Sequence, residues 1–322
     1  MEQRMSVTIS RVAVIGAGLV GSSWAVVFAR AGLRVGVYDA DAAQLLRAAA
    51  AIRRSLEELH AAALLRDSVA ANLDRLSFVH TLDAALADAE YAQESIVESL
   101  PAKRALFAAM DDIAAPTTIL ASSTSAFVTS SFAEGFTGSD RCVVVHPVNP
   151  PHLVPFVEVS GAHFTRADVV ARSLALMRQV GQSAIHVRKE IRGFVLNRLQ
   201  WTLLAEAYRL VSEGVATADE VDRAVRDGLG RRWAFMGPFE VGDLNAPEGI
   251  ADYLQRFGST IEAISESRQG QPLRLQPTLN DALQSEARAM WPQTRRAERL
   301  AERDRRLLKL AVLDTSNQNL QR

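Results

Sequence analysis

The sequence predicts an α/β protein in which a doubly wound, mostly parallel sheet covered by helices is followed by an all-helical domain. Up to about residue 188, short β-branched segments alternate with longer Ala- and Leu-rich segments, which is the pattern of such a sheet. Beyond that point the strand signal almost disappears, and helical spacing is found at residues 194–214, 217–229 and 295–313. We therefore expect two domains, residues 1–188 and residues 189–322.

The individual elements follow from local composition and spacing. Runs of β-branched and apolar residues predict strands at residues 11–15, 34–38, 118–120 and 142–146. Apolar residues three and four positions apart predict crossover helices at residues 19–31, 42–65 and 103–113. The segment 194–210 is apolar on more than one face, so we expect it to form the core of the second domain or part of a homodimer interface.

Composition and charge exclude several classes of partner. The 322 residues include 36 Lys and Arg against 37 Asp and Glu, so the chain lacks the basic field that nucleic acid or anionic lipid would require. No apolar run approaches the ~18 residues of a membrane span, and the first residues lack the apolar centre of a signal peptide. We expect a cytoplasmic protein whose partner is a small molecule. The single cysteine, Cys142, excludes an internal disulfide and a thiolate metal site, and we expect no metal.

A glycine-rich loop stands between the first predicted strand and the first predicted helix. Gly16 permits a tight turn, Gly18 lets the backbone approach a pyrophosphate, and Gly21 lets the helix pack closely against the strand. Asp39 follows the second strand, where it would accept from the adenosine ribose and repel a 2′-phosphate. The pattern predicts a Rossmann-type site for NAD; a glycine turn without a ligand is the alternative. The loop residues of this site are Gly16, Ala17, Gly18, Leu19, Val20 and Gly21.

Four polar residues stand in otherwise apolar surroundings. Ser125 follows a predicted strand at its carboxyl end, where doubly wound sheets bind ligands, and Asn197 lies in an apolar helix. His146 ends the strand 142–146 and is followed by a proline-rich turn. Glu158 lies in a further predicted strand, where a carboxylate is costly without a partner. Each of them singly also fits a structural role, as a turn residue, a cap or a satisfied core residue.

Six motifs together resemble the 3-hydroxyacyl-CoA dehydrogenase superfamily. They are the glycine loop, VESLPAK at residues 97–103, SSTSAF at 122–127, HPVNPP at 146–151, VEV at 157–159 and GFVLNRL at 193–199. The resemblance extends from about residue 11 to about residue 260 and is far more specific than the glycine loop alone. It implies a Rossmann-type NAD-binding domain, a helical second domain and an NAD-dependent dehydrogenase.

The resemblance implies catalytic roles for the four polar residues. His146 would be the general base that takes the alcohol proton as hydride leaves the carbinol carbon. Glu158 would orient its imidazole and stabilise the cation, which fits the raised pKa and fixed tautomer of a histidine paired with a carboxylate. Ser125 and Asn197 would hydrogen-bond the substrate oxygen.

The resemblance also implies further contacts with the cofactor. Asn149 and Ser125 would lie near the nicotinamide ribose. Glu98 and Lys103, in the VESLPAK motif, match positions that contact NAD in the family. Together with the glycine loop and Asp39, these residues make up the predicted cofactor site.

The substrate is suggested by two stretches of the sequence. In the family, a lysine-rich helix meets the phosphates of CoA; here Ser55 matches that helix, but Ala62 stands where a lysine is expected. Arg231 and Arg232 precede a Trp-Ala-Phe run in the second domain, where the guanidinium of Arg232 would suit a free carboxylate. We therefore expect NAD-dependent oxidation of the 3-hydroxyl of a small free hydroxy acid, with L-gulonate as the first candidate.

Three alternatives remain open at this point. A short-chain (S)-3-hydroxyacyl-CoA dehydrogenase would use the same four polar residues and differ in what binds the substrate tail. L-Carnitine is a rival substrate, although the resemblance places an aspartate rather than Asn197 in the carnitine enzymes. A crystallin-like, non-catalytic NAD-binding protein is the third, and the joint presence of Ser125, His146, Glu158 and Asn197 argues against it.

Overall fold

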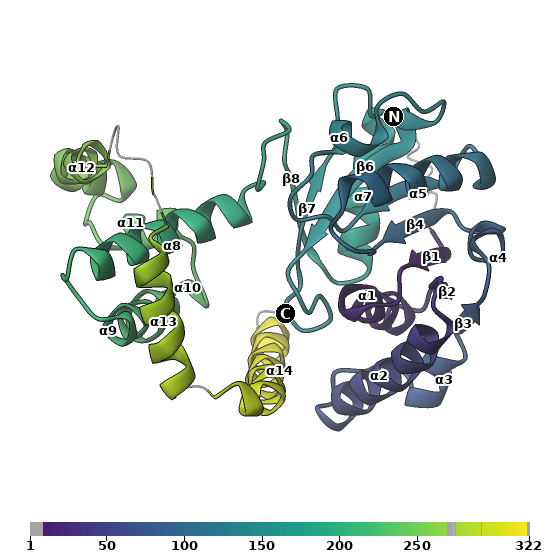
Figure 1. Cartoon of the computed structure of the whole chain (residues 1–322), viewed down its shortest axis with the longest axis horizontal. Helices are drawn as coiled ribbons and strands as arrows, with labels where there is room; N and C mark the ends of the chain where they lie inside the picture. The colour runs from purple at the N-terminus through teal and green to yellow at the C-terminus, as the bar shows by residue number, and fades with distance from the viewer. Residues whose placement is uncertain (1–8, 269–272, 274, 291, 321–322) are drawn as a thin grey trace. The chain divides into compact units, whose positions relative to one another are not determined.

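A computed structural model describes residues 9–268, 273, 275–290 and 292–320, with side chains to residue 313. Its centre is one eight-stranded sheet with the order β3-β2-β1-β4-β5-β6-β7-β8 (Figure 1). Every neighbouring pair is parallel except β6 and β7, which pair antiparallel. The prediction of a doubly wound, mostly parallel sheet is confirmed. The strands are β1 (Arg11–Ile15), β2 (Arg34–Tyr38), β3 (Leu76–Val79), β4 (Tyr91–Glu94), β5 (Ile119–Ser122), β6 (Cys142–Pro147), β7 (Phe156–Ser160) and β8 (Ser183–His186).

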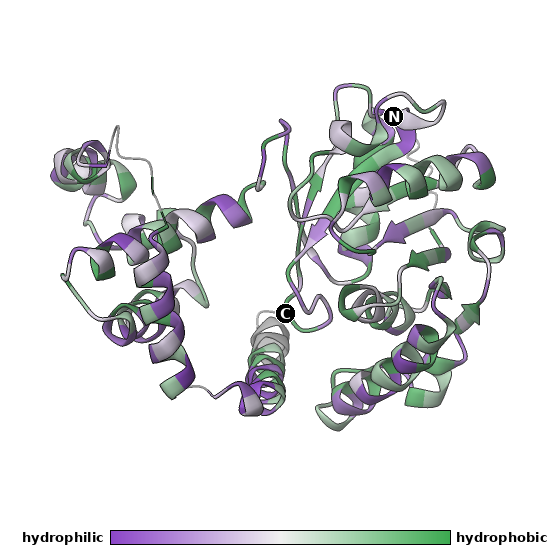
Figure 2. Cartoon of the chain, in the orientation of Figure 1, coloured by the Kyte–Doolittle hydropathy of each residue, from purple (hydrophilic) through white to green (hydrophobic). Residues whose placement is uncertain are grey.

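Helices cover both faces of this sheet. Side chains of β1 alternate between the faces, so that Val12 and Val14 join one buried cluster while Ala13 and Ile15 join the other. Figure 2 shows hydrophobic residues along most of the strands and on the helices that cover them. The helices that precede residue 190 are α1 (Leu19–Arg30), α2 (Ala42–Ala61), α3 (Val69–Leu73), α4 (Leu82–Leu86), α5 (Leu100–Ile113), α6 (Thr129–Ala133), a 3-10 turn (Ser139–Arg141) and α7 (Ala167–Gln179).

The chain forms two compact units. One comprises the chain up to Arg198 together with the segment from Glu298 on, and the other comprises Leu199–Ala297. The predicted helical second domain is confirmed, whereas its boundary at residue 189 stays a prediction. Its elements are α8 (Leu196–Ser212), α9 (Ala218–Arg223), a π-helical segment (Ala224–Leu229), α10 (Gly230–Trp233), α11 (Pro238–Leu244), α12 (Ile250–Glu266), α13 (Pro277–Met290) and a 3-10 turn (Gln293–Arg295).

The last helix, α14 (Arg296–Leu320), belongs mostly to the first unit. Leu307 and Leu308 of this helix pack against the buried cluster that α1 and α2 share with the sheet. The sequence predicts the helix but not this return, because its charged pattern leaves only a narrow apolar stripe.

The predicted end of the second crossover helix is wrong. Helix α2 ends at Ala61, not at residue 65, and Ala63 adopts a left-handed conformation with a φ of 57°. The backbone N–H of Ala63 bonds the carbonyl of His60, and that of Leu64 bonds the carbonyl of Leu59, which closes the helix. Because alanine is the best helix former, composition gives no sign of this stop.

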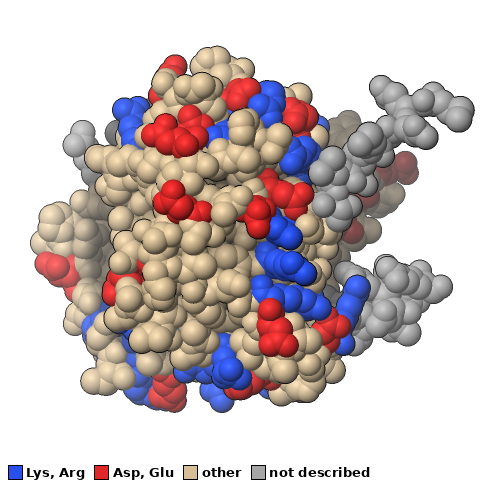
Figure 3. All heavy atoms as spheres, turned by 90° about the vertical axis from the view of Figure 1, so that its right-hand side faces the viewer, with Lys and Arg blue, Asp and Glu red and all other residues tan. Residues whose placement is uncertain are grey.

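The surface of the protein carries charged side chains of both signs. On the face drawn in Figure 3, acidic and basic side chains are interspersed, and one short row of basic side chains is bordered by acidic ones. Within the described ranges, no helix combines the length and the apolar character that crossing a bilayer requires. The same part of the chain contains no cluster of three or more side chains suited to bind a metal ion.

Candidate active site

The glycine loop joins β1 to α1 at the carboxyl edge of the sheet. Gly16 has a φ of 95°, and a Cβ there would lie 2.8 Å from the backbone of Ser95. A Cβ on Gly21 would lie 1.8 Å from the carbonyl oxygen of Gly16, so helix and strand meet as closely as backbone allows. A Cβ on Gly18, in contrast, would meet nothing within 4 Å. The loop is therefore packed tightly on the side of the sheet and open at Gly18, where a pyrophosphate approaches such a loop.

Asp39 is held beside this loop at the end of β2. Its Oδ2 accepts from the backbone N–H of Ala17 at 2.8 Å, and its Oδ1 accepts from Asp41 N at 3.0 Å. Helix α1 carries neither an acidic residue nor a capping side chain at its N-terminus, which leaves its first N–H groups for an anion. Leu19 and Val97, 67% and 72% exposed, offer apolar surface at the same edge. These features fit a dinucleotide.

His146 and Glu158 form a buried pair at the antiparallel step of the sheet. They are register partners on β6 and β7, and His146 Nδ1 lies 2.8 Å from Glu158 Oε2. The carboxylate is fully buried, and its Oε1 accepts from the backbone N–H groups of Val195 and Leu196 at 2.8 and 2.9 Å. The ring of Phe194 lies 5.3 Å from that of His146. Because Nδ1 faces the carboxylate, Nε2 is the nitrogen left to exchange a proton with a ligand.

Ser125 and Asn197 meet next to this pair. Asn197 follows Leu196 in the first turn of α8, is 8% exposed, and donates from Nδ2 to the carbonyl of Ser125 at 3.2 Å. Backbone and hydrogen bonds thus connect His146, through Glu158 and the start of α8, to the Ser125 loop. The four residues singled out in the sequence lie in one connected arrangement within the first unit.

Glu98 anchors the loop that carries Ser125. Its Oε1 accepts from the Thr124 hydroxyl at 2.7 Å and from the backbone N–H groups of Ser125 and Ala126 at 2.9 Å each. Burial opposes ionisation of Glu98, but the Thr124 hydrogen bond, the charge of Lys103 and the two backbone N–H groups hold its pKa below the usual value. Glu98 is therefore a carboxylate at neutral pH, with its partly exposed side available to a ligand.

Lys103 lies beneath that loop, 1% exposed, on α5. Its Nζ contacts Glu94 Oε1 and Oε2 at 2.8 and 3.0 Å and Glu98 Oε2 at 3.3 Å. Sequence reasoning missed Glu94, because it predicts no strand at residues 91–94. The available signal was a single charged residue within the otherwise uncharged segment YAQESIV.

The arrangement does not test two of the predicted site residues, Asn149 and Arg232. Asn149 lies in the turn after β6, and it is exposed. Arg232 is exposed on α10, which belongs to the second unit. The roles of Asn149 in cofactor binding and of Arg232 in substrate binding stay predictions.

Burial raises the pKa of Cys142 to about 12, which leaves its thiol inert.

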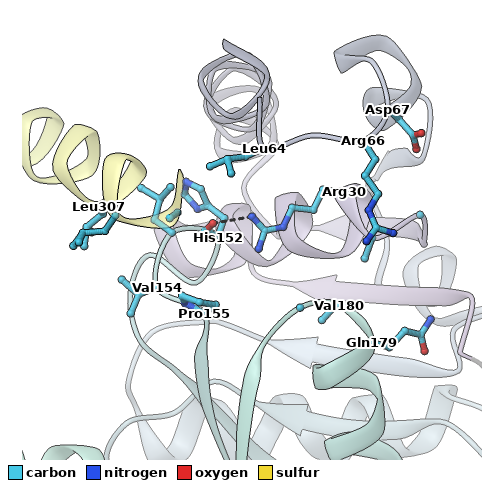
Figure 4. A pocket seen from close by; sticks show the side chains of 16 residues that line it. Arg30, Leu64, Arg66, Asp67, His152, Val154, Pro155, Gln179, Val180 and Leu307 are labelled. Atoms are coloured by element: carbon cyan, nitrogen blue, oxygen red, sulfur yellow. Dashed lines mark hydrogen bonds between the residues drawn. The ribbon is translucent and has the colours of Figure 1, made fainter. Parts of the chain in front are cut away.

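A separate hollow of about 870 Å³ lies at the other end of α1 (Figure 4). Arg30 donates there to the carbonyl of His152 at 2.8 Å. Burial and the charge of Arg30 lower the pKa of His152 to about 4, so this ring stays neutral and is a poor proton acceptor at neutral pH. His146 is therefore a better candidate than His152 for the base that exchanges a proton with a ligand.

The arrangement at that edge suits proton transfer coupled to hydride transfer. His146 Nε2 can take a proton from a hydroxyl, Glu158 stabilises the imidazolium that forms, and the Ser125 hydroxyl and Asn197 amide can hold the reacting oxygen. The glycine loop and Asp39 would hold NAD, which would supply the hydride acceptor. These functions define a dehydrogenase of the dinucleotide-binding class.

Comparison with known proteins identifies the family. Residues 11–191 match the NAD binding domain of 3-hydroxyacyl-CoA dehydrogenase, and residues 193–285 match its C-terminal domain. The chain belongs to this family and is an NAD-dependent hydroxy acid dehydrogenase, as the resemblance predicts.

The chain is similar to relatives and solved structures of several different names. The chain is 42% identical to a lambda-crystallin homolog of Bos taurus over 79% of each chain. It is 40% identical to an L-carnitine dehydrogenase of Burkholderia mallei over 78% of this chain and 77% of that one. Among solved structures, an NAD⁺-dependent 5-formyl-3-hydroxy-2-methylpyridine 4-carboxylic acid 5-dehydrogenase matches with a TM-score of 0.82 and 25% identity, covering 95% of this chain and 98% of that chain. An (S)-3-hydroxybutyryl-CoA dehydrogenase from Ralstonia eutropha matches with a TM-score of 0.66 and 25% identity, covering 79% and 89%.

Replacing His146 with Ala should lower turnover by roughly 10² to 10⁴, because the general base is lost. The dissociation constant for NAD should stay within about twofold of wild type, since the glycine loop and Asp39 are untouched. Steady-state NADH absorbance and calorimetric titration with NAD measure the two quantities. Turnover close to wild type would remove His146 from the role of base.

Proposed function

We propose that the protein oxidises the 3-hydroxyl of a small free hydroxy acid with NAD, and that L-gulonate 3-dehydrogenase activity is the first to test. The observation that carries the reaction is the buried His146–Glu158 pair at 2.8 Å, which is joined through the start of α8 to Asn197 and Ser125. In the forward direction His146 takes the hydroxyl proton as hydride departs from the same carbon. In reverse the imidazolium returns that proton to the ketone oxygen.

The preference for a free acid is supported by the surroundings of α2. Ala62, at the position of the expected lysine, already lies beyond the last residue of this helix. A hollow of about 1010 Å³ runs from Gly18 and Leu19 along α2 to α14. Three of the four arginines that line it already form ion pairs with acidic neighbours, namely Arg47 with Asp41, Arg303 with Asp304 and Arg305 with Glu302. The phosphates of CoA would compete with these carboxylates for the arginines.

L-Carnitine is the second candidate. It is itself a 3-hydroxy acid, and the 40% identity to the enzyme of Burkholderia mallei supports it. A quaternary ammonium is usually bound among aromatic rings, and among the residues that the structure describes Phe194 alone forms a ring contact with His146. L-Gulonate needs no such cage, so it stands first.

We further propose that Arg232 binds the substrate carboxylate. Arg231 precedes it on the same short helix and is equally exposed, so it serves as the matched control. Arg232→Met should raise the Michaelis constant by about 10- to 150-fold, the equivalent of a charged hydrogen bond of roughly 1.5 to 3 kcal/mol, whereas Arg231→Met should leave it within about twofold.

The substrate panel that tests this proposal contains L-gulonate, L-carnitine, 3-hydroxybutyrate and 3-hydroxybutyryl-CoA, each followed by NADH absorbance. We expect the free acids to react and the thioester to be poor. Preferential oxidation of 3-hydroxybutyryl-CoA, or inhibition of the enzyme by free CoA, would overturn the free-acid proposal. Equal effects of the two arginine variants would remove Arg232 from the substrate site.

We also propose that the protein is a homodimer that associates through its helical unit. Of the described residues between 199 and 297, only Gly242 and Ala246 are buried. Leu199, Trp201 and Leu204 on α8 are 62%, 48% and 61% exposed. A helical unit of this length without a buried core is not stable alone, so its apolar surface requires a cover. A hollow of about 440 Å³ beside Trp201 and Leu204 could receive a partner side chain.

The dimer is tested with the variant Leu204→Glu. Sedimentation equilibrium of wild type should give twice the chain mass of 35.1 kDa, and the variant should weaken association by roughly 30-fold or more, as for a hot-spot residue worth about 2 kcal/mol. Leu46→Glu is the control, since Leu46 is 76% exposed on α2 of the other unit. A monomeric wild type, or equal effects of the two variants, would contradict this interface.

A further inference from the structure

Glu94 is the centre of a buried polar network beneath the cofactor edge, and the proton-transfer chemistry above does not use it. It is the last residue of β4 and is fully buried. Its Oε1 accepts from the backbone N–H of Ile96 at 2.7 Å and from Lys103 at 2.8 Å. Its Oε2 accepts from Lys103 at 3.0 Å and from the hydroxyl of Ser122, its register partner on β5, at 2.5 Å. The carboxylate therefore ties the ends of β4 and β5 to α5.

Two parts of the cofactor edge are attached to this network. Lys103 reaches Glu98 at 3.3 Å, and Glu98 in turn holds the backbone N–H groups of Ser125 and Ala126. On the other side, Gly16 packs against the peptide group that joins Ser95 to Ile96, with 3.0 Å between the Ile96 nitrogen and a Cβ placed on that glycine. A shift of the Glu94 carboxylate would thus displace both the Ser125 loop and the glycine loop.

Stability alone does not explain an ion pair in this position. Glu94 and Lys103 expose 0% and 1% of their side chains, so both charges are removed from water. Such pairs are often no more stabilising than apolar residues of the same volume, because desolvation offsets the attraction. What a fixed ammonium does supply is an anchor for a second carboxylate, and Glu98 is the one within reach.

We propose that Glu94 is a positioning residue for NAD binding: it fixes Lys103, Lys103 fixes Glu98, and Glu98 fixes the Ser125 loop. In this arrangement Lys103, which is 1% exposed, acts through Glu98, which departs from the direct contact with NAD that the family resemblance implies for this position. The proposal concerns NAD binding alone and is independent of which hydroxy acid the enzyme oxidises.

The single variant Glu94→Gln should affect both stability and NAD binding. The unpaired ammonium of Lys103 should lower the thermal midpoint by roughly 6 to 20 °C. The dissociation constant for NAD, measured by calorimetric titration, should rise by roughly 10- to 150-fold, as for a lost charged hydrogen bond. An unchanged constant would overturn the proposal.

The double variant Glu94→Gln/Lys103→Met separates positioning from simple stability. It leaves no unpaired buried charge, so the thermal midpoint should return to within a few degrees of wild type. The NAD constant should remain raised, because Glu98 has lost its anchor. Recovery of the constant together with the midpoint would mean that the pair is structural only, and would overturn the proposal.

The path through Glu98 is tested by repeating these changes in a Glu98→Gln background. If Glu94 and Lys103 act through Glu98, they should raise the NAD constant there by less than about twofold. If the rise in the NAD constant caused by the Glu94 and Lys103 changes is as large in this background as in wild type, Lys103 contacts NAD directly and the proposal is overturned. Glu94→Asp, which keeps the charge but shortens its reach towards Lys103, repeats the test should the double variant fail to fold: a rise of roughly 2- to 12-fold should disappear in the same background.

Asp111→Asn provides the matched control. Asp111 also lies on α5, and its carboxylate pairs with the buried Arg141 at 2.7 Å. This variant should lower the thermal midpoint by a similar amount, yet leave the NAD constant within about twofold of wild type. If the constant rises as much as in Glu94→Gln, NAD binding merely follows stability and the proposal fails.

Discussion

The Glu158 carboxylate is shared between two parts of the active site that come from distant regions of the chain. Its Oε2 meets His146 Nδ1 at 2.8 Å, and its Oε1 accepts the N–H groups of Val195 and Leu196. A fully buried carboxylate is tolerated only with such complete pairing. Orientation of the base and the start of α8, which carries Asn197, are therefore set by the same group. A change in the position of the Glu158 carboxylate would therefore move both the His146 ring and the start of α8.

The position of this carboxylate follows from the one antiparallel step in the sheet. The parallel strands β4, β5 and β6 bring their carboxyl ends, and the polar residues that follow them, to one edge. Strand β7 then returns alongside β6, which places Glu158 directly opposite His146. The apolar alternation along the strands buries both faces, so polar chemistry is confined to the edge. The glycine loop, the His146–Glu158 pair, Ser125 and Asn197 are found at that edge for this reason.

Sequence reasoning recovered the elements whose signal is local. The glycine loop, the strands at residues 11–15 and 34–38, and the polar residues His146, Glu158 and Asn197 stand out in largely apolar segments, whereas Ser125 is marked by its place after a strand. It missed Glu94, because the strand that carries it is short and ends in polar residues, and because a buried ion pair is visible only once α5 is packed on the sheet. The stop of α2 and the return of α14 to the first unit likewise depend on tertiary packing, which no local propensity records.

Hydrogen exchange at the start of α8 in a Glu158→Ala variant tests most directly whether one carboxylate governs both base and helix. The Val195 and Leu196 amides, whose acceptor is lost, should exchange faster, and turnover should fall by roughly 10² to 10⁴. In a His146→Ala variant the same amides should stay protected, since their acceptor remains. Unchanged exchange in Glu158→Ala, with turnover alone reduced, would contradict the account.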